Sequence, residues 1–162
     1  MYLLRVVMND EVIGKALVEL ADLMVCTSND FHNLHFNVKG IEFDTLHRKA
    51  LKKYYESAAN DFDELYEKAS MFVEAIPSLN LAAERIGYEI DLERTSSRLV
   101  DRQEAVMRCN GILELINECW YKCYCLFNDI HETRCIGVAN FLQTRIEYWS
   151  KELYYFNARR IV

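Results

Sequence analysis

Histidine and carboxylate side chains are the residues of this chain that could bind a metal ion. The chain has 25 acidic residues and four histidines, His32, His35, His47 and His131. Imidazole and carboxylate groups together bind iron in both oxidation states, and a coordination position left open admits an oxidant. A di-iron centre inside a four-helix bundle normally uses Glu-x-x-His on two helices, and this sequence contains no such motif. An iron centre buried within one bundle is therefore not predicted.

The elements that must position these residues are helices, because apolar residues recur at three- and four-residue steps along most of the chain. We expect helices over residues 10–38, 44–73, 90–129 and 133–159. Gly40 is placed to end the first helix and Pro77 to stop the second. The longest connection, residues 78–88, has room for a short helix. The pattern predicts one all-α domain over residues 1–162, a four-helix bundle with a long crossover between helices two and three.

Composition limits the partners of the protein. The chain carries 19 basic and 25 acidic residues, a net charge of −6, and has no basic N-terminal arm. DNA binding is therefore not expected. No stretch reaches the roughly 18 unbroken apolar residues of a membrane span, and the apolar start is too short for a signal peptide. We expect a soluble, cytoplasmic protein.

Six cysteines raise the question of a disulfide or zinc site. A disulfide framework is not expected without a signal peptide. Cys119 and Cys123 are one helical turn apart and could share a metal ion, but Cys125 points elsewhere on the same helix. Structural zinc sites usually use C-x2-C pairs, and none is present. We expect the group that includes Cys135 to pack as small apolar side chains.

One stretch carries a family resemblance. The segment NLHFNVKG at residues 33–40 is followed by Phe43, by Leu46-His47 and by DELYE at residues 63–67. This order resembles the Dps family of starvation-induced mini-ferritins, which reads H-(W/F)-N-V-x-G-x-x-F-x-x-L-H and then D-x-x-x-E. The segments ANFL and ELYYFNA near the C-terminus are similar to the last helix of that family. The resemblance covers most of the chain.

The resemblance implies a ferritin-like four-helix bundle assembled as a homo-oligomer, a hollow dodecamer. Proteins of this family bind ferrous iron between two-fold-related subunits, oxidise it, commonly with hydrogen peroxide, and store the ferric product. Carried over by motif, the ligands are His35 and His47 from one subunit and Asp63 and Glu67 from its neighbour. His32 and His131 are expected to be ordinary surface residues.

The spacing in helix two departs from the family pattern. The family places the Asp fifteen residues after the second His, whereas Asp63 is sixteen after His47. In an α-helix fifteen steps leave about 60° between two side chains, and sixteen leave about 160°. Either a one-residue π-bulge lies between His47 and Asp63, or the iron site is broken. Asp61, fourteen residues after His47, is a spare candidate ligand.

A second reading of the same residues stays open. In an unbroken α-helix the ligand positions of the family fall on Leu51, Phe62 and Tyr66. These side chains cannot bind iron as carboxylates do, and they favour a diverged Dps-like bundle that has lost iron chemistry and binds another protein. Anaerobic titration with ferrous iron separates the two hypotheses.

Overall fold

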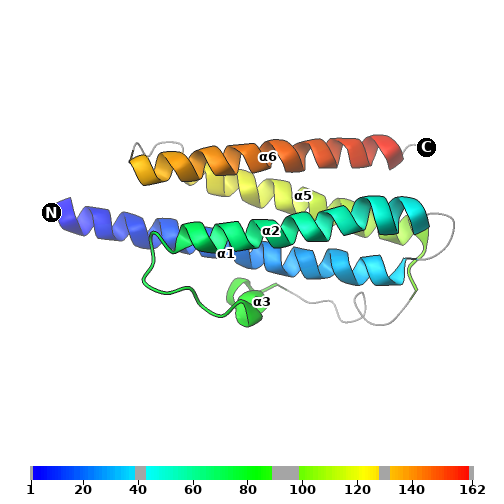
Figure 1. Ribbon diagram of the computed structural model, residues 1–162, viewed down its shortest axis with the longest axis horizontal. Coiled ribbons are helices and arrows are strands. Elements are labelled where there is room, and N and C mark those ends of the chain that lie inside the picture. The colour runs from blue at the N-terminus through cyan, green and yellow to red at the C-terminus, as the bar shows by residue number, and fades with distance from the viewer. Residues whose placement is uncertain (1, 39–42, 89–98, 128–131, 161–162) are drawn as a thin grey trace.

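The computed structural model of the protein is a set of long helices lying side by side (Figure 1). It describes residues 2–38, 43–88, 99–127 and 132–160, except the side chains of residues 2–9, 43–45, 47, 159 and 160. Gly40 and His131 lie outside the described residues. The long helices are α1 (Tyr2–Asn37), α2 (Lys52–Ala69), α5 (Arg102–Phe127) and α6 (Thr133–Arg160). The described part is all-α as predicted, and no helix in it is long and apolar enough to cross a membrane.

The direction of the helices requires one long connection (Figure 1). α1 and α2 run antiparallel, as do α5 and α6. Because α5 runs in the same direction as α2, the chain between them must return along the length of the molecule. A 3₁₀ turn, Leu79–Leu81, and the short helix α3 (Ala82–Ile86) lie in this connection. It occupies the place where the sequence predicts the long crossover and its short helix.

The third long helix begins later than the sequence predicts. The apolar pattern predicts a helix from residue 90, but residues 99–101 are not helical and α5 starts at Arg102. The amide N–H of Val100 donates to the carbonyl oxygen of Asn37 at 3.0 Å. Oδ1 of Asp101 then accepts from the amide N–H of Glu104 at 2.9 Å and caps α5. Residues 89–98, the rest of the predicted start, lie outside the described part.

The first helix begins earlier than the sequence predicts. The apolar pattern predicts a helix from residue 10, but α1 begins at Tyr2. Asp10 lies inside the helix and accepts from Nη2 of Arg134 in α6 at 3.0 Å. A polar turn within a long helix is stable when its side chains reach solvent or a charged partner.

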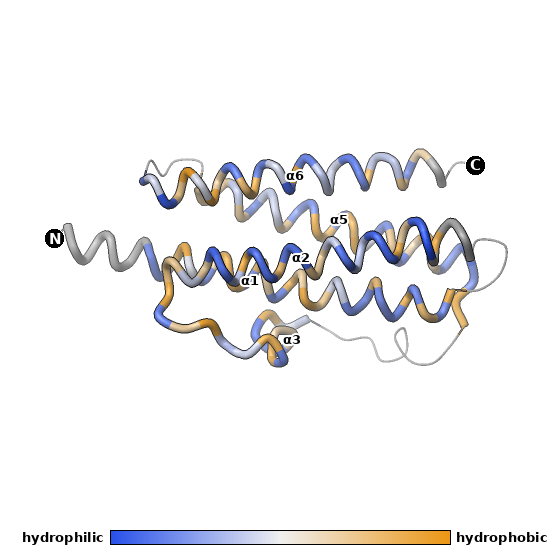
Figure 2. Tube along the Cα trace, in the orientation of Figure 1, coloured by the Kyte–Doolittle hydropathy of each residue, from blue (hydrophilic) through white to orange (hydrophobic). Residues whose placement is uncertain are grey.

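Aromatic and aliphatic side chains fill the space between the long helices. Trp120, Trp149, Tyr54 and Phe31 are fully buried and come from four different helices. The indole N–H of Trp120 donates to Sδ of Met24 at 3.1 Å. Figure 2 shows apolar and polar residues alternating along each long helix, the pattern of helices with one face buried.

A buried ionic network ties the connection to α1 and α2. Asp22 of α1 is fully buried. Nη2 and Nε of Arg85 in α3 donate to its carboxylate at 2.6 and 2.8 Å, and the hydroxyl of Tyr66 in α2 donates at 2.5 Å. A buried carboxylate requires such partners. Gly87, with φ of 63°, ends α3 in the left-handed conformation that glycine adopts at no steric cost.

Gly14 is the point of closest approach between α1 and the residues after α2. A Cβ atom at Gly14 would lie 2.3 Å from Cγ1 of Val73 and 3.2 Å from Cβ of Phe72. We expect Gly14→Ala to lower the free energy of unfolding by roughly 1–3 kcal/mol, because the core there has no spare volume. Urea unfolding measures this loss.

Gly111 in α5 is the matched control for Gly14. A Cβ atom at Gly111 meets nothing within 4 Å. Gly111→Ala should therefore stabilise the helix by roughly 0.5–1 kcal/mol, since alanine loses less backbone entropy. Equal effects of the two substitutions would contradict the close packing at Gly14.

Candidate metal centre

His35 lies near the C-terminal end of α1 and is almost fully buried against α2. Its side chain is 8% exposed, and its ring centroid is 5.2 Å from that of Tyr55, edge to face. His32, one turn earlier, is half-buried and stacks on Phe36 at 4.5 Å and on Tyr55 at 4.1 Å. The expectation that His32 is an ordinary surface residue is wrong: its ring is part of the aromatic wall beside His35.

The helical segment that carries His47 has π rather than α geometry. Residues Phe43–Leu51 form a π-helix, with hydrogen bonds five residues apart, and α2 follows directly. The buried side chains of the π-helix and of the first turn of α2 are Leu46, Ala50, Leu51 and Tyr54. The step from Leu46 to Leu51 is five residues, as in a π-helix, whereas Leu46, Ala50 and Tyr54 are four residues apart, as in an α-helical stripe.

The π-helix changes the relative direction of His47 and Asp63. In a continuous α-helix their sixteen steps would leave about 160° between the two Cα–Cβ directions. One extra residue in a π-turn takes up about 100° of this, which leaves about 60°. The sequence raises a one-residue π-bulge between His47 and Asp63 as one alternative; the backbone has instead a nine-residue π-helix, Phe43–Leu51, that begins before His47 and ends after it. The side chain of His47 lies outside the described residues.

Asp63 and Glu67 lie on the exposed face of α2. Their four-residue spacing places both side chains on one side of the helix, and both are exposed. Neither carboxylate has a hydrogen bond or an ion pair within the described part of the chain. Two neighbouring uncompensated carboxylates are suited to binding a cation.

Asp61, the spare candidate, faces the opposite way. It is 3% exposed, and its Oδ1 lies 2.7 Å from Nε of Arg145 in α6. The indole N–H of Trp149 donates to its Oδ2 at 2.8 Å. Its carboxylate is thus occupied inside the helical bundle, and we remove Asp61 from the ligand set.

The three residues that would occupy the ligand positions of the family in an unbroken α-helix also face inwards. Leu51 is fully buried, Tyr66 is 8% exposed and bound to Asp22, and Phe62 is half-buried. They are core residues, so their apolar character follows from packing. In the π-register the residue one turn after His47 is Lys52, which is exposed.

One copy of the chain does not bring the four candidate ligands together. His47 and Asp63 are separated by sixteen residues of helix, about 24 Å at 1.5 Å per residue. Among the described residues, no three of His, Cys, Asp and Glu lie close enough to hold a metal ion. Any site that uses His35 and His47 with Asp63 and Glu67 must therefore be built from two copies.

Most of the cysteines pack as the sequence predicts, but Cys125 does not, because it lies on the exposed side of α5. All six are free thiols; Cys26, Cys109, Cys123 and Cys135 are buried, Cys119 is half-buried and Cys125 is exposed. Burial raises the pKa of Cys123 to about 12. Burial, with the nearby Asp30 carboxylate, raises the pKa of Cys26 to about 11. These thiols stay protonated at neutral pH, the form that neither binds metal nor attacks electrophiles.

The burial of the cysteines predicts the order in which they react. In the native protein at pH 8 we expect Cys125 to be alkylated first, and Cys26 and Cys123 at least about 100-fold more slowly. Peptide mass spectrometry after timed exposure to iodoacetamide measures each rate. Modification of Cys123 as fast as Cys125 would contradict the packing described here.

The described residues define an all-α protein of four long helices with a row of acidic side chains on the exposed face of α2. No family model matches the chain, and no curated protein sequence matches it. Among solved structures it is similar to the crystal structure of antigen TpF1 from Treponema pallidum, with a TM-score of 0.78 and 19% identity over 94% of this chain and 93% of that chain. At this identity the similarity shows a shared fold alone.

Proposed function

We propose that the protein is a Dps-like, ferritin-like iron-oxidising protein, with its substrate site at the interface between two copies of the chain. Ferrous iron would be held by His35 and His47 of one copy and by Asp63 and Glu67 of the other. Two ferrous ions and two protons reduce one hydrogen peroxide to two waters, and the ferric product is retained inside the assembly. The observation that carries the proposal is the π-helix, which compensates the extra residue between His47 and Asp63.

The geometry of α2 fits a two-fold interface. In such an interface residue i of one copy meets residue j of the other, and j meets i. A two-fold axis crossing the first turn of α2 at Tyr55, midway in sequence between His47 and Asp63, would place Asp63 of each copy opposite His47 of the other. The exposed stripe Lys52, Glu56, Asp63 and Glu67 would then lie against the neighbouring copy.

Each ligand type has a physical reason in this arrangement. His35 is held by the rings around it and loses little freedom on binding iron. Asp63 and Glu67 supply negative charge that stabilises the ferric product. A mixed set of imidazole and carboxylate ligands leaves coordination positions for the oxidant.

Anaerobic titration with ferrous iron tests the proposal, with particle mass measured on the same sample. We expect saturable binding of about two iron ions per interface in a particle of about twelve subunits. Absence of saturable binding in an intact oligomer would refute the iron chemistry.

A second candidate function is supported by Lys52. The family often has an acid one turn after the second His, whereas the π-register places the exposed Lys52 there. Its positive charge would oppose iron binding. The alternative is therefore a diverged Dps-like bundle that binds another protein, and a failed iron titration with an intact fold would favour it.

A further inference from the structure

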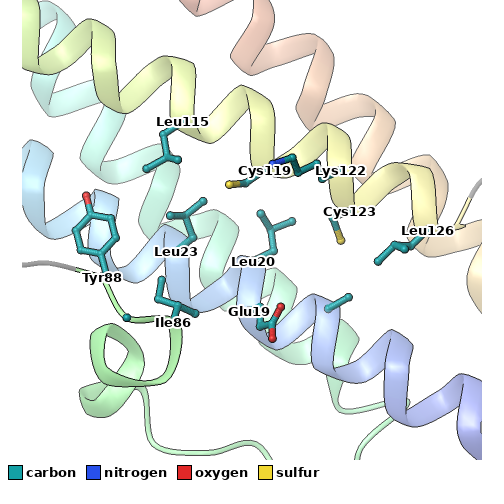
Figure 3. A pocket seen from close by; sticks show the side chains of 12 residues that line it. Glu19, Leu20, Leu23, Ile86, Tyr88, Leu115, Cys119, Lys122, Cys123 and Leu126 are labelled. Carbon is teal, nitrogen blue, oxygen red and sulfur yellow. The ribbon is translucent and has the colours of Figure 1, made fainter.

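A cavity of about 580 Å³ lies between α1, α5 and the residues that follow α3. Figure 3 shows Leu20 and Leu23 of α1 facing Leu115 of α5, with Tyr88 and Leu126 at opposite ends. This volume is in the range of pockets that hold small organic molecules. None of the residues that line the cavity belongs to α2 or to the proposed ligand set, so the cavity is independent of the proposed iron site.

The wall of the cavity formed by the connection is held in place. The hydroxyl of Tyr88 donates to the carboxylate of Asp30 in α1. Three residues earlier, Arg85 forms its ion pair with the buried Asp22. These two anchors flank Ile86 and Gly87, which line the cavity. The pocket is thus formed before any ligand enters, which reduces the entropy cost of binding.

The interior of the cavity is apolar and chemically inert. Five of the twelve lining residues are leucine or isoleucine, and the sulfur atoms of Cys119 and Cys123 also face the cavity. Burial raises the pKa of both thiols. Protonated thiols act as soft, polarisable wall atoms, so the walls suit noncovalent contact with an apolar body rather than covalent chemistry.

Two charged side chains line the cavity, and their charges are not equivalent. Lys122 forms an ion pair with Glu118, since its Nζ lies 2.7 Å from Oε1 of that residue. Glu19 is exposed and forms no ion pair with any described residue. Among the described residues that line the cavity, the carboxylate of Glu19 is therefore the charge without an ion-pair partner, and it is complementary to a cation.

We propose that this cavity binds a small amphiphilic amine, an apolar ring or chain that occupies the space between Tyr88 and Leu126 and carries an ammonium group that pairs with Glu19. The apolar body supplies most of the affinity, because it leaves water on entering the cavity. The ammonium group supplies the preference over neutral and anionic molecules of the same shape.

Three dansyl probes that share a five-carbon chain and end in an amine, a methyl group or a carboxylate test the proposal. Their fluorescence rises when the dansyl ring enters an apolar site. We expect saturable binding in the order amine, methyl, carboxylate, with the amine about fivefold tighter than the methyl probe at low salt. The preference should shrink at high salt, since exposed charges are screened.

Variants of two exposed glutamates test whether Glu19 carries the negative charge that pairs with the amine. Glu19→Gln should remove the preference for the amine and leave binding of the methyl probe unchanged. Glu11→Gln removes an exposed carboxylate from the same helix outside the cavity and is the matched control. It should leave both affinities unchanged.

The rate at which Cys119 is alkylated shows whether the probe binds in the cavity. Saturating amine probe should slow alkylation of Cys119, which lines the cavity, and leave the exposed Cys125 unaffected. Cys119→Phe, which fills the cavity, should abolish binding while circular dichroism shows an unchanged helical content.

Each of the following results would overturn the proposal. They are no saturable binding of the amine probe, equal affinity for amine and methyl probes, an unchanged preference in Glu19→Gln, and no protection of Cys119. If the wild type binds no probe and the particle mass of Cys119→Phe differs from that of the wild type, the lining of the cavity is an interface with a second copy of the chain. That result would also overturn the proposal. None of these results bears on the proposed iron site, which the ferrous titration tests separately.

Discussion

Replacing His35 and His47 with alanine together is expected to abolish saturable ferrous binding and to slow iron oxidation at least about 100-fold. The reason is that both imidazoles of the proposed site are lost, and the two remaining carboxylates on α2 are solvated. Anaerobic titration and the initial rate of ferric absorbance after adding hydrogen peroxide measure the two effects.

The matched control is His32→Ala. It removes an imidazole one turn away on α1, whose ring stacks on Phe36 and Tyr55. We expect this variant to keep iron binding, because His32 is not in the proposed ligand set. Loss of binding in His32→Ala together with normal binding in the double variant would contradict the assignment.

An equivalent double variant tests the two carboxylates of the proposed site. Asp63→Asn with Glu67→Gln should have the same effect as the double histidine variant. Glu64→Gln is its control, because Glu64 is exposed on the same helix and pairs only distantly with Lys68, at 3.9 Å.

Mixing the two inactive variants tests whether the site spans two copies. In a random mixture half of the two-fold pairs are mixed, and each mixed pair contains one site with all four ligands. Refolding the variants together should therefore restore about one quarter of the wild-type activity. No recovery in correctly assembled particles would mean that the four residues do not act across an interface.

Changing the number of residues between His47 and Asp63 is expected to have the second-largest effect on iron oxidation. Deleting Lys49, which is exposed, leaves buried residues at steps of three and four from Leu46, as in an α-helix. His47 and Asp63 are then fifteen residues apart, and the direction between them stays near 60°. We expect the deletion variant to bind iron nearly as well as the wild type.

Inserting one alanine after Lys49 is the opposite change. The core residues of α2 fix its register, so the insertion must rotate the segment that carries His47 by about 100°. Because misplaced ligands cannot meet the metal together, we expect a loss of about 100-fold in iron oxidation. Loss in the deletion variant with retention in the insertion variant would show that the segment is α-helical.

Several features of the fold could be predicted from particular residues. Leu17, Leu20 and Met24 recur with helical spacing and are buried in α1, and Pro77 follows the end of α2. The prediction that the cysteines are packing residues is confirmed for Cys123 and Cys135 and is wrong for Cys125, which is exposed. The start of α5 could not be predicted, because Val100 pairs with the backbone of Asn37, far away in the sequence.

The signal for the π-helix was present but ambiguous. Leu46, Ala50, Leu51 and Tyr54 include two apolar residues in succession, and a sequence does not say which of them is buried. Packing against α1 buries both. The role of Asp61 was equally hidden, because Arg145 and Trp149 come from a helix more than eighty residues later.

The sequence by itself determined the helices and the candidate ligand types, because helical periodicity and short motifs are local properties of the chain. Only the tertiary structure decided which carboxylates are available and how His47 and Asp63 are oriented. The physical reason is that burial depends on contacts between distant segments. Packing with α1 and α6 places Leu51 and Asp61 inside the bundle and leaves Asp63 and Glu67 on its surface.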